Sequence, residues 1–164
     1  MLAVRAFPIP ALVLAIVLFG ACATDVRQWQ LPQSIQGAKI EYQRWAGPSL
    51  EDNFVAVPIL IEDLDTELQA ITLYTASLEA GGYTSDFWSV TGVRGRLILD
   101  SLRRAYGFSG EERVDVVEGK RVVRARMDPD VPFDEAPYFY SFGNTAVIIQ
   151  GTPAQAADAL RQLP

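Results

Sequence analysis

Apolar and polar residues alternate with a period of two along several stretches of the chain, which is typical of strands with one buried face. Such an alternation predicts a strand over residues 40–45, and residues 87–90 predict a second, shorter strand. Residues 54–61 are continuously apolar, which predicts a buried strand. Pro58 lacks an amide hydrogen, so we expect that strand to lie at a sheet edge or to be broken there.

Three other stretches place apolar residues at helical spacing, which predicts helices with one buried side. The first covers residues 64–80 and has Asp65 as its cap. The second covers residues 94–106, and the third opens with Thr152-Pro153, a cap followed by a first-turn proline. The apolar sides consist, in chain order, of Leu64, Leu68, Ile71, Thr75 and Leu78, of Ile98, Leu102 and Ala105, and of Ala156, Leu160 and Leu163.

Two hairpins are expected in the last third of the chain, because two-residue loops separate alternating strands there. Glu118-Gly119 forms one loop and Gly143-Asn144 forms the other. Pairing across the second loop gives both faces of that hairpin apolar residues, with Tyr140 opposite Val147 and Phe139 opposite Ile148. Strands that are apolar on both faces usually lie inside a sheet, so we expect this hairpin to be central.

Strands and helices do not alternate regularly enough for a doubly wound parallel sheet. The pattern therefore predicts an α+β fold, a mainly antiparallel sheet with about three helices packed on one face. We expect this single domain over residues 38–164. Residues 23–37 are polar and show neither period, which predicts a tether; in the alternative, Trp29 and Leu31 dock on the domain.

The first 22 residues differ from the rest of the chain. Arg5 precedes an apolar run over residues 6–19, and small residues follow at positions 20–23. A positive start, an apolar run and a small-residue end are the features of an export signal. The run is shorter than the roughly 20 apolar residues that a membrane-spanning helix needs. We therefore expect residues 1–22 to be a signal peptide.

The end of this segment, Phe19-Gly20-Ala21-Cys22, resembles the lipobox of bacterial lipoproteins, with Phe19 where that motif usually has leucine. The resemblance implies that Cys22, the single cysteine, is lipidated and becomes the new N-terminus. In this respect the chain is similar to small lipoproteins of bacterial envelopes, which implies an anchor in the cell membrane or the outer membrane. The alternative is ordinary signal cleavage, which leaves Thr24 first and gives a secreted or periplasmic protein.

The composition narrows the chemistry that the protein can carry. The 164 residues include 14 lysine and arginine and 20 aspartate and glutamate residues, a formal charge of −6, which argues against nucleic acid as a partner. The chain has no histidine and one cysteine. These counts exclude Ser-His-Asp and Cys-His catalysis, zinc sites with histidine ligands, and a disulfide within the chain.

Three groups of side chains are candidates for a site. The first is a loop with four carboxylates, which is a candidate for calcium but also fits a solvated connector: Asp128, Asp130, Asp134 and Glu135. The second is the pair Arg124 and Arg126, which alternation places on one strand face. These arginines either hold an anionic ligand or headgroup, or balance the charge of nearby acidic residues. The third is a set of aromatic side chains on one strand, which either form a recognition surface or belong to the core of the sheet: Tyr138, Tyr140 and Phe142.

Together these features favour a non-enzymatic binding or structural module, because the usual catalytic residue sets are missing while carboxylates, arginines and tyrosines can still bind a ligand. We expect the membrane as a partner through the lipid on Cys22, an envelope protein as a further partner, and no cofactor. Two alternatives stay open: a hydrolase that works with carboxylates alone, and a calcium-binding accessory protein.

Overall fold

The computed structural model describes residues 31–108, 111–126 and 128–164. In this part of the chain, eight strands form one sheet: β1 (Ser34–Ile35), β2 (Ala38–Ala46), β3 (Ile71–Leu78), β4 (Thr84–Val90), β5 (Glu112–Val117), β6 (Lys120–Ala125), β7 (Tyr138–Phe142) and β8 (Thr145–Gln150). The helices of the same residues are α1 (Pro48–Asn53), α2 (Ala56–Leu64), α3 (Gly95–Ala105) and α4 (Pro153–Gln162), with a short 3₁₀ helix, η2 (Leu68–Ala70), before β3.

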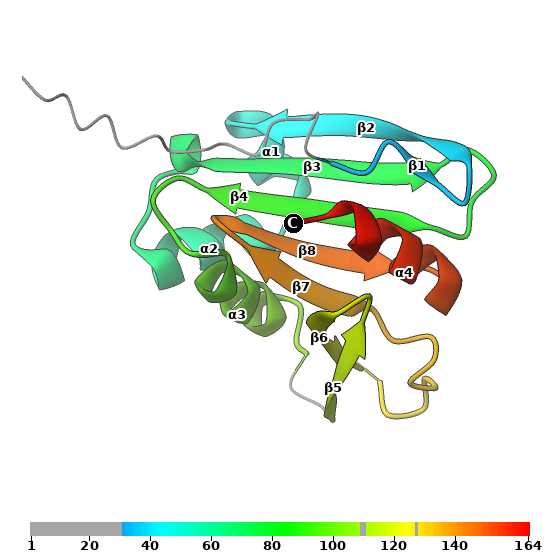
Figure 1. The fold of residues 1–164 in the computed structure, drawn as a ribbon. Coiled ribbons are helices and arrows are strands. Elements are labelled where there is room, and N and C mark those ends of the chain that lie inside the picture. The colour runs from blue at the N-terminus through cyan, green and yellow to red at the C-terminus, as the bar shows by residue number, and fades with distance from the viewer. Residues whose placement is uncertain (1–30, 109–110, 127) are drawn as a thin grey trace, which may run out of the picture.

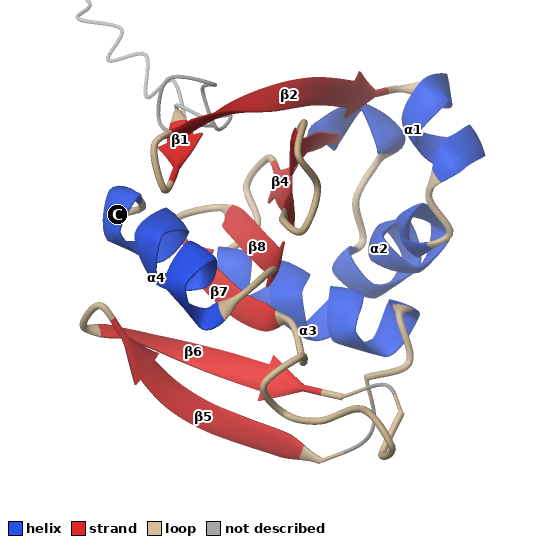
Figure 2. Ribbon diagram, turned by 90° about the vertical axis from the view of Figure 1, so that its right-hand side faces the viewer, coloured by secondary structure: helices blue, strands red, loops and turns tan. Residues whose placement is uncertain are grey.

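All neighbouring strands are antiparallel, in the order β1-β2-β3-β4-β8-β7-β6-β5 (Figure 1). β4 and β8 lie at the centre of the sheet, and β5 forms one edge. Helices α1, α2 and α3 lie on one face, and α4 lies on the other (Figure 2). Buried side chains form one cluster on each face, with Ile149 among the α4 residues and Ile148 among those of α2 and α3. The α+β fold with a mainly antiparallel sheet is thus confirmed.

The position of α4 differs from the expectation that about three helices share one face. The chain reverses after β8, so that α4 returns over the face that carries Tyr138 and Ile149. The reason lies in the central strands, because an uncovered face of a strand that is apolar on both faces would expose its side chains to water. A helix on each face buries both sets.

The strand expected over residues 54–61 is wrong, because Phe54 caps the end of α1, Val55 caps the start of α2, and residues 56–61 lie in α2. Pro58 is the third residue of α2, where an amide has no partner within the helix, so the proline removes no hydrogen bond. Ala56, Val57 and Leu60 form the fully buried side of this helix, while Pro58 lies on its exposed side. A short apolar run is compatible with a buried helix as well as with a strand, and here packing selects the helix.

The helix expected over residues 64–80 is also wrong, because residues 71–78 form β3. Asp65 has a left-handed backbone with a φ of 46° and ends α2 instead of starting a new helix. β3 lies between β2 and β4 and is buried on both faces, by Leu73 on the side of α1–α3 and by Tyr74 on the side of α4. Because β3 is apolar on both faces, its apolar residues also occur at the spacing expected of a helix.

Most of the remaining elements follow the sequence pattern, whereas β1, α1 and η2 were not expected from it. β2, β4, α3 and both hairpins lie where they were expected, and the register pairs Tyr140 with Val147 and Phe139 with Ile148. The Glu118-Gly119 loop has φ angles of 49° and 74°, the left-handed pair that a two-residue hairpin turn requires. Thr152 caps α4 by accepting a hydrogen bond from the Gln155 amide, and the Gln155 side chain bonds the Thr152 amide in return.

Close contact between α3 and the sheet depends on a glycine. The Gly95 amide donates a hydrogen bond to the Gly143 carbonyl at 2.9 Å, which fixes the start of α3 on the β7–β8 turn. A Cβ at position 95 would lie 2.2 Å from the backbone oxygen of Thr145, so no larger residue fits without a shift of the helix. This contact sets the distance between α3 and the neighbouring strands.

The residues immediately before β2 lie against the domain. Leu31 is 3% exposed and Ile35 is fully buried, and β1 pairs with the start of β2. Residues 31–37 of the expected tether therefore pack on the face that α4 covers. Cys22 and Trp29, with the signal segment and the rest of the tether, lie outside the described residues. No helix of the described part is long and apolar enough to cross a membrane.

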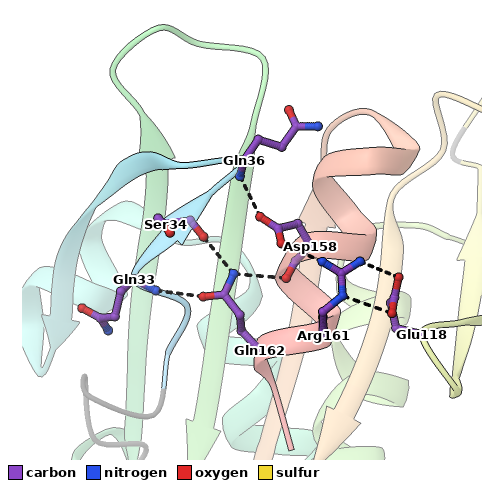
Figure 3. Close-up of polar contacts among 7 residues, drawn as sticks. All are labelled: Gln33, Ser34, Gln36, Glu118, Asp158, Arg161 and Gln162. Carbon is purple, nitrogen blue, oxygen red and sulfur yellow. Dashed lines mark hydrogen bonds and ion pairs between the residues drawn. The ribbon is translucent and has the colours of Figure 1, made fainter.

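Polar contacts fasten this N-terminal segment to α4 (Figure 3). The Gln162 side chain accepts a hydrogen bond from the Gln33 amide at 3.3 Å and donates one to the Ser34 carbonyl at 2.8 Å. One turn earlier on α4, the Asp158 carboxylate accepts a hydrogen bond from the Gln36 amide at 2.6 Å. Two side chains of one helix thus satisfy three backbone groups of the entering chain.

Candidate functional site

The three aromatic candidates all lie on the face of the sheet that α4 covers. Tyr138 is 3% exposed and belongs to the core on that face. Tyr140 and Phe142 are half-buried at the edge of this core, with ring centroids 6.0 Å apart. The Tyr140 hydroxyl donates a hydrogen bond to the carbonyl of Pro164 at the end of the chain. These side chains hold the C-terminal segment against the sheet.

The two arginine candidates hold the loop between β6 and β7. Arg124 is buried, its guanidinium lies 4.3 Å from the centroid of the Tyr138 ring, and it donates a hydrogen bond to the Ala136 carbonyl. Arg126 lies 4.5 Å from the centroid of the Phe133 ring and forms an ion pair with Glu111. It also donates hydrogen bonds to two loop carbonyls, those of Pro129 and Val131. Both guanidinium groups therefore serve the protein's own loop in this structure.

The four acidic candidates lie on that loop and are exposed: Asp128, Asp130, Asp134 and Glu135. The Asp128 carboxylate accepts a hydrogen bond from the Asp130 amide at 2.9 Å, a local contact of the turn. Within the described ranges, no three acidic, histidine or cysteine side chains come together as metal ligands.

A cleft of about 260 Å³ opens between α3 and the strands β6 and β7. We call it the α3 cleft. Its charged lining consists of Arg96, Asp100 and Arg103 from α3 and of Arg121 from β6. The remaining lining residues are Leu99, Val123, Phe139, Tyr140 and Ser141, of which Tyr140 directs its side chain to the opposite face of β7. The close contact at Gly95 fixes the start of α3, which carries Arg96, on the β7–β8 turn.

The charges of the α3 cleft are only partly balanced. Arg103 forms an ion pair with Glu112 and lies 3.6 Å from Asp100. Arg96 and Arg121 are exposed and form no ion pair or hydrogen bond through their side chains with any residue that the structure describes. The cleft thus presents two available guanidinium groups above an apolar floor.

Sequence reasoning did not single out Arg96 and Arg121 as a pair. They lie on different elements, and Arg96 precedes Asp100 by four residues, a spacing at which the two side chains can pair on a helix. In the structure Asp100 turns to Arg103 instead, which leaves Arg96 available. The one signal in the sequence was the number of arginines around residues 94–104, in a chain whose net charge is negative.

The carboxyl group of Asp86 on β4 is partly buried. Asp86 shares the face of Trp88 and has no ion pair or hydrogen bond through its side chain in the described structure. Burial raises the pKa of Asp86 to about 6. Tyr106, just after α3, has its pKa raised to about 12 by its own burial and by the nearby charge of Asp86. Asp86 was also not anticipated, because the short polar stretch before Phe87 gave no sign of burial.

Comparison with known proteins gives no relative for this arrangement, since no protein family, no curated protein and no solved structure matches the chain.

Proposed function

We propose that this protein is a non-enzymatic binding module of the bacterial envelope, and that the α3 cleft binds an anionic ligand. The observation that carries the binding proposal is the pair Arg96 and Arg121, two guanidinium groups without ion-pair partners in the described structure that line one cleft. Guanidinium groups offer parallel N–H donors that match the oxygens of a carboxylate or phosphate.

The local charge supports an anion although the whole chain is acidic. The lining carries three arginines, against Asp100 and the neighbouring Glu112 that pairs with Arg103, so it stays positive whereas the chain has a formal charge of −6. Interactions between exposed charges fall off over about 8–10 Å at physiological ionic strength, so a ligand in the cleft responds mainly to the lining. The arginines therefore outweigh the distant acids.

The floor of the cleft defines the ligand further. Leu99, Val123 and Phe139 supply apolar surface beneath the arginines. An anion that carries a small apolar group would bury that group against the floor, at a gain of roughly 25 cal/mol for each Å² removed from water. The volume of about 260 Å³ fits a small molecule or one end of a larger one.

Calorimetric titration of the full chain with inorganic phosphate and with phenyl phosphate tests this proposal. We expect phenyl phosphate to bind more tightly, because its ring reaches the floor. The double variant Arg96→Ala/Arg121→Ala is expected to bind about tenfold more weakly or worse, since each charge-assisted hydrogen bond contributes about 1.5–3 kcal/mol. Arg44→Ala removes an exposed arginine from β2 and serves as the matched control.

Two results would contradict the binding proposal. One is equal affinity of the parent chain and the double variant for phenyl phosphate. The other is an equal loss in Arg44→Ala, which would mean that the anion responds to charge in general and not to the cleft.

The envelope location rests on the sequence of residues 19–22 and on the single cysteine. We propose that Cys22 carries the lipid that holds the protein at the membrane, since several acyl chains on one residue anchor a protein stably. Mass spectrometry of the mature N-terminus is expected to show a lipidated cysteine, and the variant Cys22→Ser is expected to lose the lipid. A free N-terminus at Thr24 would contradict the anchor and indicate a released protein.

A further inference from the structure

The strand β5 forms an open edge of the sheet. It is the last strand in the order, and no element of the described structure lies beyond it (Figure 2). Val114 is 51% exposed and Val116 is 74% exposed on the same face of this strand. An edge strand offers unpaired amide and carbonyl groups, and exposed valines on it add apolar surface, so such an edge is a template for pairing with another strand.

The hairpin geometry fixes which backbone groups of β5 point outward. In a two-residue hairpin the residues on either side of the loop, here Val117 and Lys120, form a hydrogen-bonded pair. Hydrogen-bonded and non-bonded pairs then alternate along the ladder, so that Arg113, Asp115 and Val117 bond to β6. Glu112, Val114 and Val116 therefore direct their amide and carbonyl groups away from the sheet.

The charges of β5 lie on the other face of the strand from Val114. Arg113 and Asp115 are two residues apart and share that face. Their side chains form an ion pair, with Nε of Arg113 3.1 Å from the Asp115 carboxylate. One strand face thus carries a basic and an acidic residue placed symmetrically about Val114.

We propose that β5 pairs with β5 of a second copy of this chain, antiparallel and around a two-fold axis at Val114. This register sets Val114 opposite its own copy, and it sets Arg113 of each copy opposite Asp115 of the other. Both charge pairs are attractive, and the outward groups of Glu112, Val114 and Val116 meet one another in phase.

The neighbouring registers are unfavourable for the same reasons. A two-fold axis at position 113 sets Arg113 opposite Arg113 of the second copy, and an axis at position 115 sets Asp115 opposite Asp115. Like charges directly opposite destabilise a strand pair. A shift by a single residue places outward groups opposite inward ones and breaks the ladder. Among these neighbouring registers, the charge pattern of β5 therefore favours the one centred on Val114.

The other face of the pair is compatible with this register. Val114 meets its own copy, and Val116 meets the aliphatic part of Glu112 of the second copy. The Glu112 carboxylate forms an ion pair with Arg103 on α3, which directs its charge away from the edge. The exposed valines are thus covered and no carboxylate is buried with them.

Charge reversal of single residues tests the pairing. The full chain in detergent is expected to sediment as a dimer in equilibrium with monomer, within a range of about 1 µM to about 1 mM. Arg113→Asp and Asp115→Arg each turn two attractive pairs into repulsive ones, and each variant is expected to dimerise about tenfold more weakly or worse. Arg44→Asp makes the same charge change on β2 and is the matched control, expected to dimerise like the parent chain.

Mixing the two weakened variants gives the decisive result. A tagged Arg113→Asp chain has acids at both positions, and an untagged Asp115→Arg chain has arginines at both, so the mixture restores both attractive pairs. We expect the tagged chain to retain the untagged one, while neither variant associates with itself. All variants share the anchor and the detergent, so association through micelles would be the same in each. A parent chain that stays monomeric to about 1 mM, or a mixture that fails to associate, overturns the proposal.

Discussion

Replacement of Asp86 by asparagine is expected to stabilise the protein at neutral and alkaline pH. Asp86 is partly buried on β4 without an ion pair or hydrogen bond among the described residues, and burial raises the pKa of its carboxyl to about 6 from an ordinary value of 3.8. The charged form is therefore less favourable in the folded protein than in the unfolded chain. Asparagine has the same shape and carries no charge at any pH.

The sign and size follow from the difference in pKa. A group that binds its proton more tightly when folded makes the folded state more stable at low pH. The gain from Asp86 is complete below its unfolded pKa of 3.8 and is lost as the pH rises through about 6. At about 1.4 kcal/mol for each pKa unit, this loss amounts to at most about 3 kcal/mol, because part of the side chain still reaches water. Such an amount is a large part of the typical stability of a domain, about 5–15 kcal/mol.

Urea unfolding of the parent chain and of Asp86→Asn at pH 4 and at pH 8 measures this effect. The difference in the free energy of unfolding between the two proteins is expected to move in favour of the variant by about 2–3 kcal/mol from the lower to the higher pH. Asp63→Asn is the control of opposite sign, since hydrogen bonds from Ser101 and Arg104 lower the pKa of Asp63. A difference between parent and Asp86→Asn that does not change with pH would refute the reasoning.

Three further substitutions test the fold. Gly95→Ala is expected to lower the stability by about 1–3 kcal/mol in urea unfolding, because its Cβ would lie 2.2 Å from the Thr145 oxygen. Thr152→Ala removes the cap of α4 and is expected to cost about 1 kcal/mol in the same assay. Asp158→Ala removes the acceptor of the Gln36 amide, so hydrogen exchange of that amide is expected to become faster, and an unchanged rate would contradict the contact.

The sequence sufficed where local chemistry decides the structure. The register of β7 with β8 follows from the Gly143-Asn144 loop, because a two-residue turn leaves one way to pair the flanking strands. The start of α4 follows from Thr152-Pro153 in the same way. In both cases neighbouring residues carry the whole signal, and tertiary packing only agrees with it.

Residues 54–78 show where local pattern is insufficient. The apolar run of α2 and the doubly buried strand β3 each satisfy more than one period, so the choice depends on what packs against them. Once η2 and the left-handed Asp65 end the helical segment early, β3 is free to extend between β2 and β4. The order of the strands depends on contacts between residues far apart in the sequence, so it cannot be predicted from the local spacing of apolar residues.

The candidate site could not be predicted for a related reason. Alternation correctly placed Tyr138, Tyr140 and Phe142 on one strand face, but it did not contain the fact that α4 and Pro164 cover that face. In the same way, Arg121 and Arg96 line one cleft only because α3 packs beside β6 and β7 in the folded chain. Arginine pairs from different elements become a site through packing, which the residue types alone do not determine.

The two proposals combine into one arrangement of surfaces. Antiparallel pairing of two β5 edges requires a two-fold axis perpendicular to the sheet, so each face of the joined sheet is formed by the same face of both copies. Both α3 clefts then lie on one side, and both N-terminal segments, which pack with α4 at Leu31, lie on the other. Under the proposal that Cys22 carries a lipid, the anchored segment of each copy leads to Leu31 on the α4 side, opposite the clefts. A ligand long enough to span both clefts with two anionic groups would bind more tightly than one in a single cleft, because the second contact forms within the complex.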